Sequence, residues 1–163
     1  MTIQHTSNEV WRAIDDENFA VLGMVNARGE ARTVGICYVI DSHKMYIGAD
    51  RSAWKTRHVA TNRHVSVTIP IARRVPLLPW IKVPAATITF SGTGRVVDRQ
   101  EMTSDLVEKL YRHDEAGPEW CAIEVTPASD FVTYGLGISV LQMRHPDRAR
   151  GRAPRVASIA SGR

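Results

Sequence analysis

The sequence predicts a mainly β (α+β) protein, a six-stranded antiparallel β-barrel with a few peripheral helices. Two observations carry this prediction. Short apolar runs rich in branched side chains follow one another through tight turns, and the helical segments are few and short. A doubly wound parallel sheet would need a long crossover helix between successive strands, and the segments between these runs are too short for that.

The bulk composition is that of a globular domain. The chain has 163 residues, of which 44% are hydrophobic and 23% charged, enough for one domain with a substantial core. No apolar run approaches the roughly 20 residues of a membrane-spanning helix, and the first residues are polar. We therefore expect a cytoplasmic protein with no transmembrane segment.

The positive charge is concentrated at the end of the chain. Residues 144–163 contain six arginines and one acid, a net charge of +5, whereas the whole chain carries +4. The remainder therefore sums to −1, which argues against nucleic acid as a partner of the folded body. We expect a folded domain over residues 1–143 and a flexible basic tail over 144–163, because the tail lacks hydrophobic periodicity.

Most elements can be placed from periodicity and turn residues. A hairpin is expected where strands 19–25 and 32–40 flank a turn at Arg28–Gly29, and strict alternation marks another strand at 64–71. Asp98 and Glu101 form a capping box that predicts a helix to about residue 113. The remaining expected elements are a helix over 7–18 capped by Ser7, strands over 44–49 and 86–97, and a strand or strand pair over 119–135. Gly92 and Gly94 are expected to mark a bend or bulge.

The two cysteines, Cys37 and Cys121, both fall in expected strands. Neither forms part of a pair with the spacing of metal ligands, so we expect buried, reduced thiols and no metal site.

A short helix over 53–62, with Asp50 and Ser52 as N-cap candidates, carries an unusual charge pattern. Its surroundings are basic instead of acidic: Arg51, Lys55, Arg57 and Arg63, with His58 and His64. Cations are mildly unfavourable at a helix N-terminus, whose free N–H groups attract anions. A bound phosphate would explain the pattern. A solvated basic helix face is the alternative reading.

The order of segments resembles a known family. LGMVNARGEARTVGICYVID (22–41), KMYIGAD (44–50) and RSAWKTRHVATNRHVSVTI (51–69) resemble the pyridoxamine 5′-phosphate oxidase-like family of FMN-binding split barrels, and the match covers about residues 18–97. The resemblance implies a split barrel and a homodimer, with FMN or the deazaflavin coenzyme F-420 bound between the barrels of two protomers.

The resemblance also implies cofactor-binding positions. Arg32 would lie near the phosphate, and Lys55, followed by Arg57, would hold it. Backbone groups from Thr33 to Ile36 would follow the ring edge. The full set of implied positions is Arg32, Thr33, Val34, Gly35, Ile36, Ala49, Ser52, Trp54, Lys55 and Arg57.

Departures from the family pattern exclude vitamin B6 oxidation as the specific activity. Ala49 replaces a Thr, Trp54 stands at a phosphate-binding Arg position, and Cys37 occupies a Lys position of the true oxidases. The C-terminal Trp and Arg motif of those oxidases is also not recognisable. Coenzyme F-420 has an anionic tail, which the dispersed basic residues from Arg51 to Lys82 would suit.

We therefore expect a flavin- or deazaflavin-dependent oxidoreductase that transfers hydride to or from a small organic molecule. The cofactor supplies the hydride chemistry, so no catalytic residue is assigned. The alternative is a non-catalytic carrier of such a cofactor, or of haem with His58 or His64 as ligand.

An apolar segment at 75–84 contains three prolines, which exclude a regular helix. Packing at the dimer seam is the expected role of this segment. A lid or wall over the cofactor, an acceptor pocket and shallow membrane association are the alternatives.

Overall fold

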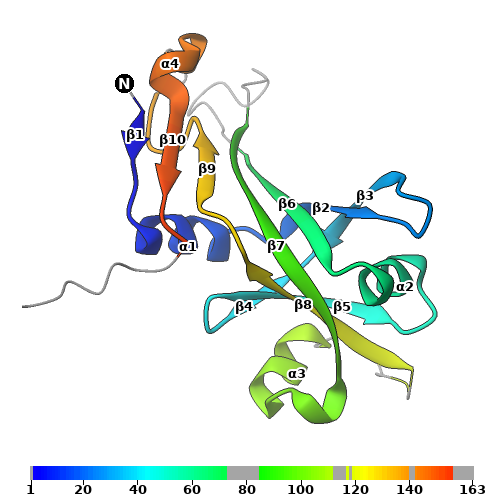
Figure 1. Cartoon of the computed structure of the whole chain (residues 1–163). Helices are drawn as coiled ribbons and strands as arrows, with labels where there is room; N and C mark the ends of the chain where they lie inside the picture. Colours follow the sequence, from blue (N-terminus) through cyan, green and yellow to red (C-terminus); the bar gives the residue numbers. More distant parts are fainter. Residues whose placement is uncertain (1, 73–84, 112–116, 118, 140–141, 156–163) are drawn as a thin grey trace, which may run out of the picture. The chain divides into compact units, whose positions relative to one another are not determined.

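The computed structural model of the protein describes residues 2–72, 85–111, 117, 119–139 and 142–155 (Figure 1). Its contacts divide the chain into two units. Unit 1 comprises residues 1–17, 68–90 and 129–163, and unit 2 comprises residues 18–67 and 91–128. Two long strands, β6 (His64–Ile71) and β7 (Ala86–Asp98), contribute residues to both units.

Unit 2 is an antiparallel β-structure with three short helical segments. Strand β2 pairs with β3, β4 with β5, β5 with β8, and β8 with the end of β7, all antiparallel as predicted. The bounds of these elements are β2 (Phe19–Val25), β3 (Ala31–Cys37), β4 (Val39–Asp41), β5 (Lys44–Asp50), α2 (Trp54–Thr61), η1 (Arg99–Glu101), α3 (Ser104–Leu110) and β8 (Trp120–Pro127).

The predicted hairpin of β2 and β3 is confirmed, with an unbroken register from Phe19↔Cys37 to Val25↔Ala31. On β2 the buried side chains are those of Ala20, Leu22 and Met24. Period-two alternation in strands places every second residue on one face. The register sets Arg32 opposite Met24 at the end of the hairpin near its turn.

The core of unit 2 is largely aliphatic, and among its described residues one charged side chain is buried. Fully buried side chains include Leu22, Met45, Ile47, Val59, Val67 and Ile123. Glu124 on β8 is only 9% exposed. Its carboxylate accepts a hydrogen bond from the Tyr46 hydroxyl at 2.9 Å and forms ion pairs with Lys44 at 3.3 Å and Arg95 at 3.4 Å. These partners offset the cost of burying the charge.

Unit 1 packs a helix and three short strands around aromatic side chains. Trp11 and Phe90 each meet the Phe131 ring edge-to-face, with centroids 5.4 and 5.3 Å away. Strand β10 pairs antiparallel with β9 and parallel with β1, and β9 pairs with Thr87–Thr89 of β7. The elements of this unit outside β6 and β7 are β1 (Ile3–Gln4), α1 (Ser7–Asp15), β9 (Phe131–Tyr134), η2 (Gln142–Arg144), α4 (Pro146–Ala149) and β10 (Arg150–Ala153).

Helix starts differ from the predicted ones by a few residues. The N-cap of α1 is Thr6 instead of Ser7, because Thr6 and Glu9 form a reciprocal capping box. The Asp98–Glu101 capping box is present, but it begins the 3-10 turn η1. The longer helix predicted there is interrupted, since Thr103 caps a separate α3.

The predicted strand over 32–40 is divided into β3 and β4. The break falls at Tyr38, whose backbone N–H donates to the Asn18 carbonyl. The described residues form ten strands instead of six. Strands β1 and β10 were not predicted, the strand over 32–40 is divided into two, and the region 119–135 forms the strand pair that was expected as an alternative to one strand.

Part of the expected basic tail has regular structure. Residues 150–153 form β10, with Gly151 and Ala153 buried and the two arginines exposed. Small residues give almost no hydrophobic signal, so composition did not reveal this strand. Residues 156–163 and the apolar segment 75–84 lie outside the described residues.

The prediction for the cysteines is half confirmed: Cys121 is buried, whereas Cys37 is exposed on β3. Among the described helices, none has the length and apolar character needed to cross a membrane.

Candidate functional site

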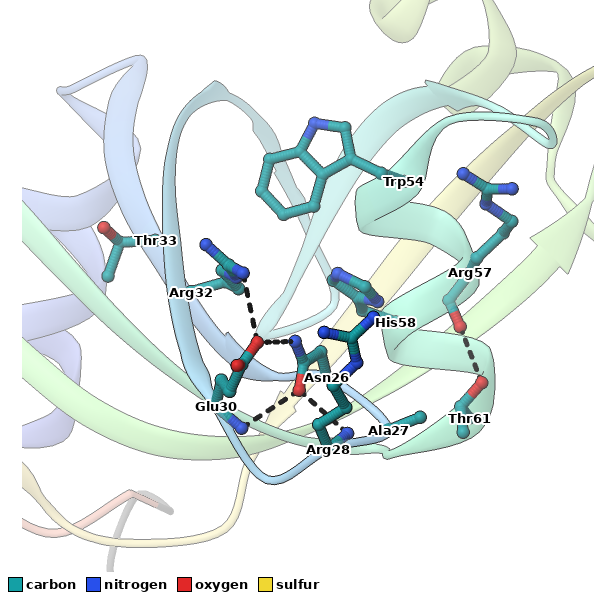
Figure 2. Close-up of a pocket in the computed structure, with 10 residues that line it drawn as sticks. All are labelled: Asn26, Ala27, Arg28, Glu30, Arg32, Thr33, Trp54, Arg57, His58 and Thr61. Atoms are coloured by element: carbon teal, nitrogen blue, oxygen red, sulfur yellow. Dashed lines mark hydrogen bonds and ion pairs between the residues drawn. The ribbon is translucent and has the colours of Figure 1, made fainter.

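A hollow of about 610 Å³ lies within unit 2, between the β2–β3 turn and helix α2 (Figure 2). Its volume falls in the roughly 300–1,000 Å³ range typical of small-molecule sites. The residues that line it are Asn26, Ala27, Arg28, Glu30, Arg32, Thr33, Trp54, Arg57, His58 and Thr61.

Asn26 builds the turn on one side of the hollow. Its Oδ1 accepts hydrogen bonds from the backbone N–H groups of Arg28 at 2.9 Å and Glu30 at 3.0 Å. The turn also requires Gly29, which has a φ of 80°. Such side-chain-to-backbone bonds by Asn fix a turn locally. Figure 2 shows the Arg28 side chain extending from this turn toward α2.

The carboxylate of Glu30 lies between two donors at the same turn. Its Oε2 accepts from Asn26 Nδ2 at 2.6 Å and from Arg32 Nη2 at 3.1 Å. The amide of Asn26 holds the pKa of the Glu30 carboxyl below its ordinary value, and Arg32 acts in the same direction. Glu30 is therefore a carboxylate near neutral pH, paired with a cation of the hollow.

Helix α2 forms the opposite wall. Thr56 and Val59 are buried, whereas Trp54, Arg57, His58 and Thr61 line the hollow. The helix starts at Ala53 without any side-chain cap. Its first N–H groups thus receive no side-chain acceptor, and they add partial positive charge at this wall.

Asp50 and Ser52 do not cap α2 as predicted. The carboxylate of Asp50 instead accepts from the N–H of Ser52 at 2.7 Å and from its hydroxyl. These bonds lower the pKa of Asp50 and close a tight turn ahead of the helix. The Asp50 carboxylate is therefore hydrogen-bonded to Ser52 and does not cap the helix N-terminus.

Trp54 supplies a flat apolar surface at the start of α2. Its side chain is 41% exposed, which is unusual for a large apolar group. The indole meets the imidazole of His58 edge-to-face, with centroids 5.4 Å apart. The exposed part of the indole is therefore available to a flat ligand.

The charge of the hollow is positive. Among the described residues that line it, there are three arginines (Arg28, Arg32 and Arg57) and one carboxylate, that of Glu30. Arg51, which the sequence placed in the same basic cluster, forms an ion pair with Asp98.

Four of the ten predicted positions line this hollow: Arg32, Thr33, Trp54 and Arg57. Lys55, Val34, Gly35 and Ser52 are not among its lining residues. The side chains of Ile36 and Ala49 are buried, and the Ala49 carbonyl accepts from the Cys121 thiol at 3.5 Å. Ile36 and Ala49 can therefore reach a ligand only through backbone atoms.

Strand β3 has a free hydrogen-bonding edge within the described part of the chain. It ends the order of paired strands, and its described strand partner is β2. Backbone groups of Thr33–Ile36 on the other edge are thus free to bind a ligand or another chain. Packing also favours glycine at position 35, because a Cβ there would lie 2.9 Å from the Phe19 ring.

The sequence analysis placed the turn at Arg28–Gly29 but did not assign Asn26, Arg28 or Glu30 to the site. It named His58 as part of the basic cluster and as an alternative haem ligand. The signal was present in NARGE, where Asn followed by Gly three residues later is typical of a side-chain-stabilised turn. What the sequence could not reveal is that the turn faces α2, since that depends on how the hairpin packs.

These residues fit a phosphorylated ring. Guanidinium groups bind phosphate oxygens, an uncapped helix start favours anions, and an exposed indole can stack on a flat ring. A second hollow of about 420 Å³ in the same unit shares Arg32 and Thr33 with the first. It is otherwise lined by small and apolar residues of β2, β3, β6 and β7 and by Ala128, with His64, Ser66 and Ser91 as polar groups.

Comparison with known proteins identifies the fold. No family model matches the chain, and no curated protein sequence matches it. Solved structures do match. A provisionally assigned pyridoxamine 5′-phosphate oxidase from Listeria innocua is 16% identical, with a TM-score of 0.60 over 75% of this chain and 93% of that chain.

Two further matches have different described activities. An F-420 reductase is 15% identical, with a TM-score of 0.51 over 70% of this chain and 88% of that one. A haem-binding protein from Mycobacterium smegmatis is 15% identical, with a TM-score of 0.60 over 81% of this chain and 55% of that one. The protein therefore has the split-barrel fold of the pyridoxamine 5′-phosphate oxidase-like proteins, as the sequence resemblance predicted.

Proposed function

We propose that the protein binds FMN or coenzyme F-420 in the hollow between the β2–β3 turn and α2, and acts as an oxidoreductase on a small organic molecule. The observation that carries this proposal is that three arginines, Arg28 and Arg32 of the hairpin and Arg57 of α2, line the same hollow as an exposed indole at an uncapped helix start. A bound flavin or deazaflavin supplies the hydride chemistry.

The chain's own residues would hold and orient this group. Arg32 and Arg57, with the first N–H groups of α2, would bind the phosphate. Trp54 would cover one ring face, and the free edge of β3 from Thr33 to Ile36 would bind polar atoms at the ring edge. Lys55 and Ser52 would contribute to phosphate binding from outside the hollow, and Lys55 would do so through its positive charge.

The second hollow offers a place for the hydride acceptor or donor. Because it shares Arg32 and Thr33 with the first, a molecule in it lies beside the proposed cofactor site. We also propose a homodimer, because a second copy would cover the exposed Phe19 on β2 and would enclose the cofactor bound at the neighbouring free edge of β3.

Haem binding is the second candidate. It is favoured by His58, which lines the hollow, and by the likeness to the haem-binding protein from Mycobacterium smegmatis. A carrier without turnover would use the same site.

The test is a titration of the purified protein with FMN, coenzyme F-420 and haemin, followed by absorbance and ring fluorescence. We expect saturable binding of FMN or F-420 at micromolar concentration, and turnover when the reduced cofactor meets an acceptor. Binding without turnover would favour a carrier, and haemin binding alone would favour the second candidate. Failure of all three ligands to bind would contradict a cofactor site in this hollow.

A further inference from the structure

Glu30 is the single acid among the described residues that line the hollow, and it is held there at two points. Its backbone N–H donates to Asn26 Oδ1 at 3.0 Å, while its carboxylate accepts from Asn26 Nδ2 at 2.6 Å. One side chain thus fixes both the backbone and the carboxylate of Glu30. The same carboxylate oxygen pairs with Arg32 Nη2 at 3.1 Å.

We propose that Glu30 is a built-in counter-anion of the hollow, which occupies Arg32 until a phosphate group takes its place and so keeps singly charged anions out. This inference rests on the proposed function, because it assigns the ligand selectivity of the same site. The ligand class it names is a phosphate ester or other multiply charged anion.

The physical basis is competition for one guanidinium. Glu30 is attached to the chain within two residues of Arg32, so its carboxylate meets the guanidinium at a high effective concentration. A free carboxylate or chloride offers the same charge as Glu30 and gains little by replacing it. A phosphate dianion offers more charge and can also contact the remaining cations of the hollow.

The position of Asn26 indicates that Glu30 does more than form a surface ion pair with Arg32. The energy of an exposed ion pair is usually reduced by the entropy lost in ordering two long side chains. Here Asn26 already orders the carboxylate, so Glu30 is presented to Arg32 at little further cost. In Figure 2 the Glu30 carboxylate lies between Asn26 and Arg32.

The test variant is Glu30→Gln, which keeps the shape and the backbone bond to Asn26 but removes the charge. The chain offers a matched control in Glu101→Gln. Glu101 pairs with Arg95 at 2.8 Å, and side-chain exposures are 55% and 47% there against 55% and 48% for Arg32 and Glu30. Gln also preserves the capping box in which Glu101 takes part.

Pyrophosphate binding, followed by the NMR shift of the Arg32 Nε–H group, is the direct measurement. We expect Glu30→Gln to tighten pyrophosphate binding roughly two- to fivefold, the range expected for an exposed charge pair, while Glu101→Gln leaves it unchanged. Acetate in excess should compete with pyrophosphate in Glu30→Gln and not in the wild type. Equal pyrophosphate affinities in the two variants, or acetate competition in the wild type, would overturn the inference.

FMN and riboflavin separate this inference from the proposed function. They carry the same ring, and riboflavin lacks the phosphate. Glu30→Gln should tighten FMN by a similar factor and leave riboflavin unaffected. If neither FMN nor F-420 binds any form of the protein while pyrophosphate still responds to Glu30→Gln, the proposed function fails and the counter-anion role stands.

Discussion

A Cβ atom added to Gly94 would lie 2.7 Å from Cγ1 of Val59, so β7 and α2 meet in unit 2 with no room for a side chain. The backbone N–H of Gly94 also donates to the Arg63 carbonyl at 2.7 Å, just after the end of α2. Helix α2, which carries Trp54 and Arg57, therefore packs directly against a glycine of strand β7.

Gly94→Ala should push α2 outward. We expect a loss of about 1–3 kcal/mol in the free energy of unfolding, as for overpacked cores, together with weaker ligand binding at the hollow. Chemical denaturation and ligand titration measure the two effects. Gly48→Ala is the control, because a Cβ there would meet the nearest atom at an ordinary 3.7 Å. Equal unfolding free energies for the two variants would contradict close packing of α2 against β7.

Trp54 should report ligand binding directly. A flavin or deazaflavin ring stacked on the indole would quench its fluorescence, and Trp54→Phe should abolish most of that change. Replacement by Ala should weaken binding by about 0.5–1.5 kcal/mol, the usual worth of an aromatic pair. The control is Trp120→Phe, since Trp120 packs against Tyr111 with centroids 5.2 Å apart. Ligand-induced quenching that survives in Trp54→Phe and disappears in Trp120→Phe would place the ligand elsewhere.

The buried pair of Tyr46 and Glu124 should make stability sensitive to alkali. Burial, followed by the hydrogen bond to Glu124, raises the pKa of Tyr46 from its ordinary 10 to about 12. The folded-state pKa lies above the unfolded one. The protonated phenol therefore stabilises the fold fully below pH 10, and this contribution is lost as the pH rises through about 12.

Phenolate absorbance during an alkaline titration checks this expectation. The tyrosine that ionises at the highest pH in the wild type should be missing from the titration curve of Tyr46→Phe. In Glu124→Gln its pKa should fall, because the negative partner is removed, but should stay above 10 since burial remains. A Tyr46 that ionises near pH 10 in the native protein would contradict the buried hydrogen bond.

The two thiols should differ sharply in reactivity. Cys37 is exposed on β3, whereas Cys121 is fully buried, and burial raises the pKa of its thiol. Ellman's reagent should therefore modify one thiol in the native protein and two after denaturation. Native Cys37→Ser should not react. Rapid modification of both native thiols would contradict the burial of Cys121 on β8.

The parts of the fold that local patterns determine were predictable. Alternation marked the strand at 64–71, and a glycine-containing turn between two apolar runs marked the hairpin of β2 and β3. The capping box at Asp98 was also read correctly, although the helix it begins is a single 3-10 turn. Each of these signals acts within a few residues of the chain.

What depends on packing could not be predicted. Strand β10 consists of small and basic residues and exists because β9 and β1 pair with it on both sides. The hollow was predicted in part: Arg32, Thr33, Trp54 and Arg57 were assigned to the site. Asn26, Arg28 and Glu30 were not assigned to it, because their approach to α2 depends on how the hairpin packs. Whether Lys55 and the free edge of β3 bind the cofactor stays a prediction.

Calorimetry of FMN and coenzyme F-420 with the wild type, Arg32→Ala and Arg95→Ala tests the central claim most directly. Arg95 is an equally exposed arginine of the same unit that lies outside the hollow and pairs with Glu101 and Glu124. Because Glu124 is buried, the folding of Arg95→Ala is checked by circular dichroism before the titration. We expect micromolar binding of one cofactor to the wild type and to Arg95→Ala, with a loss of about 1.5–3 kcal/mol in Arg32→Ala, as for a hydrogen bond to a charged group. Equal affinities in Arg32→Ala and Arg95→Ala, or no binding to the wild type, would contradict the claim that this hollow holds a phosphorylated redox ring.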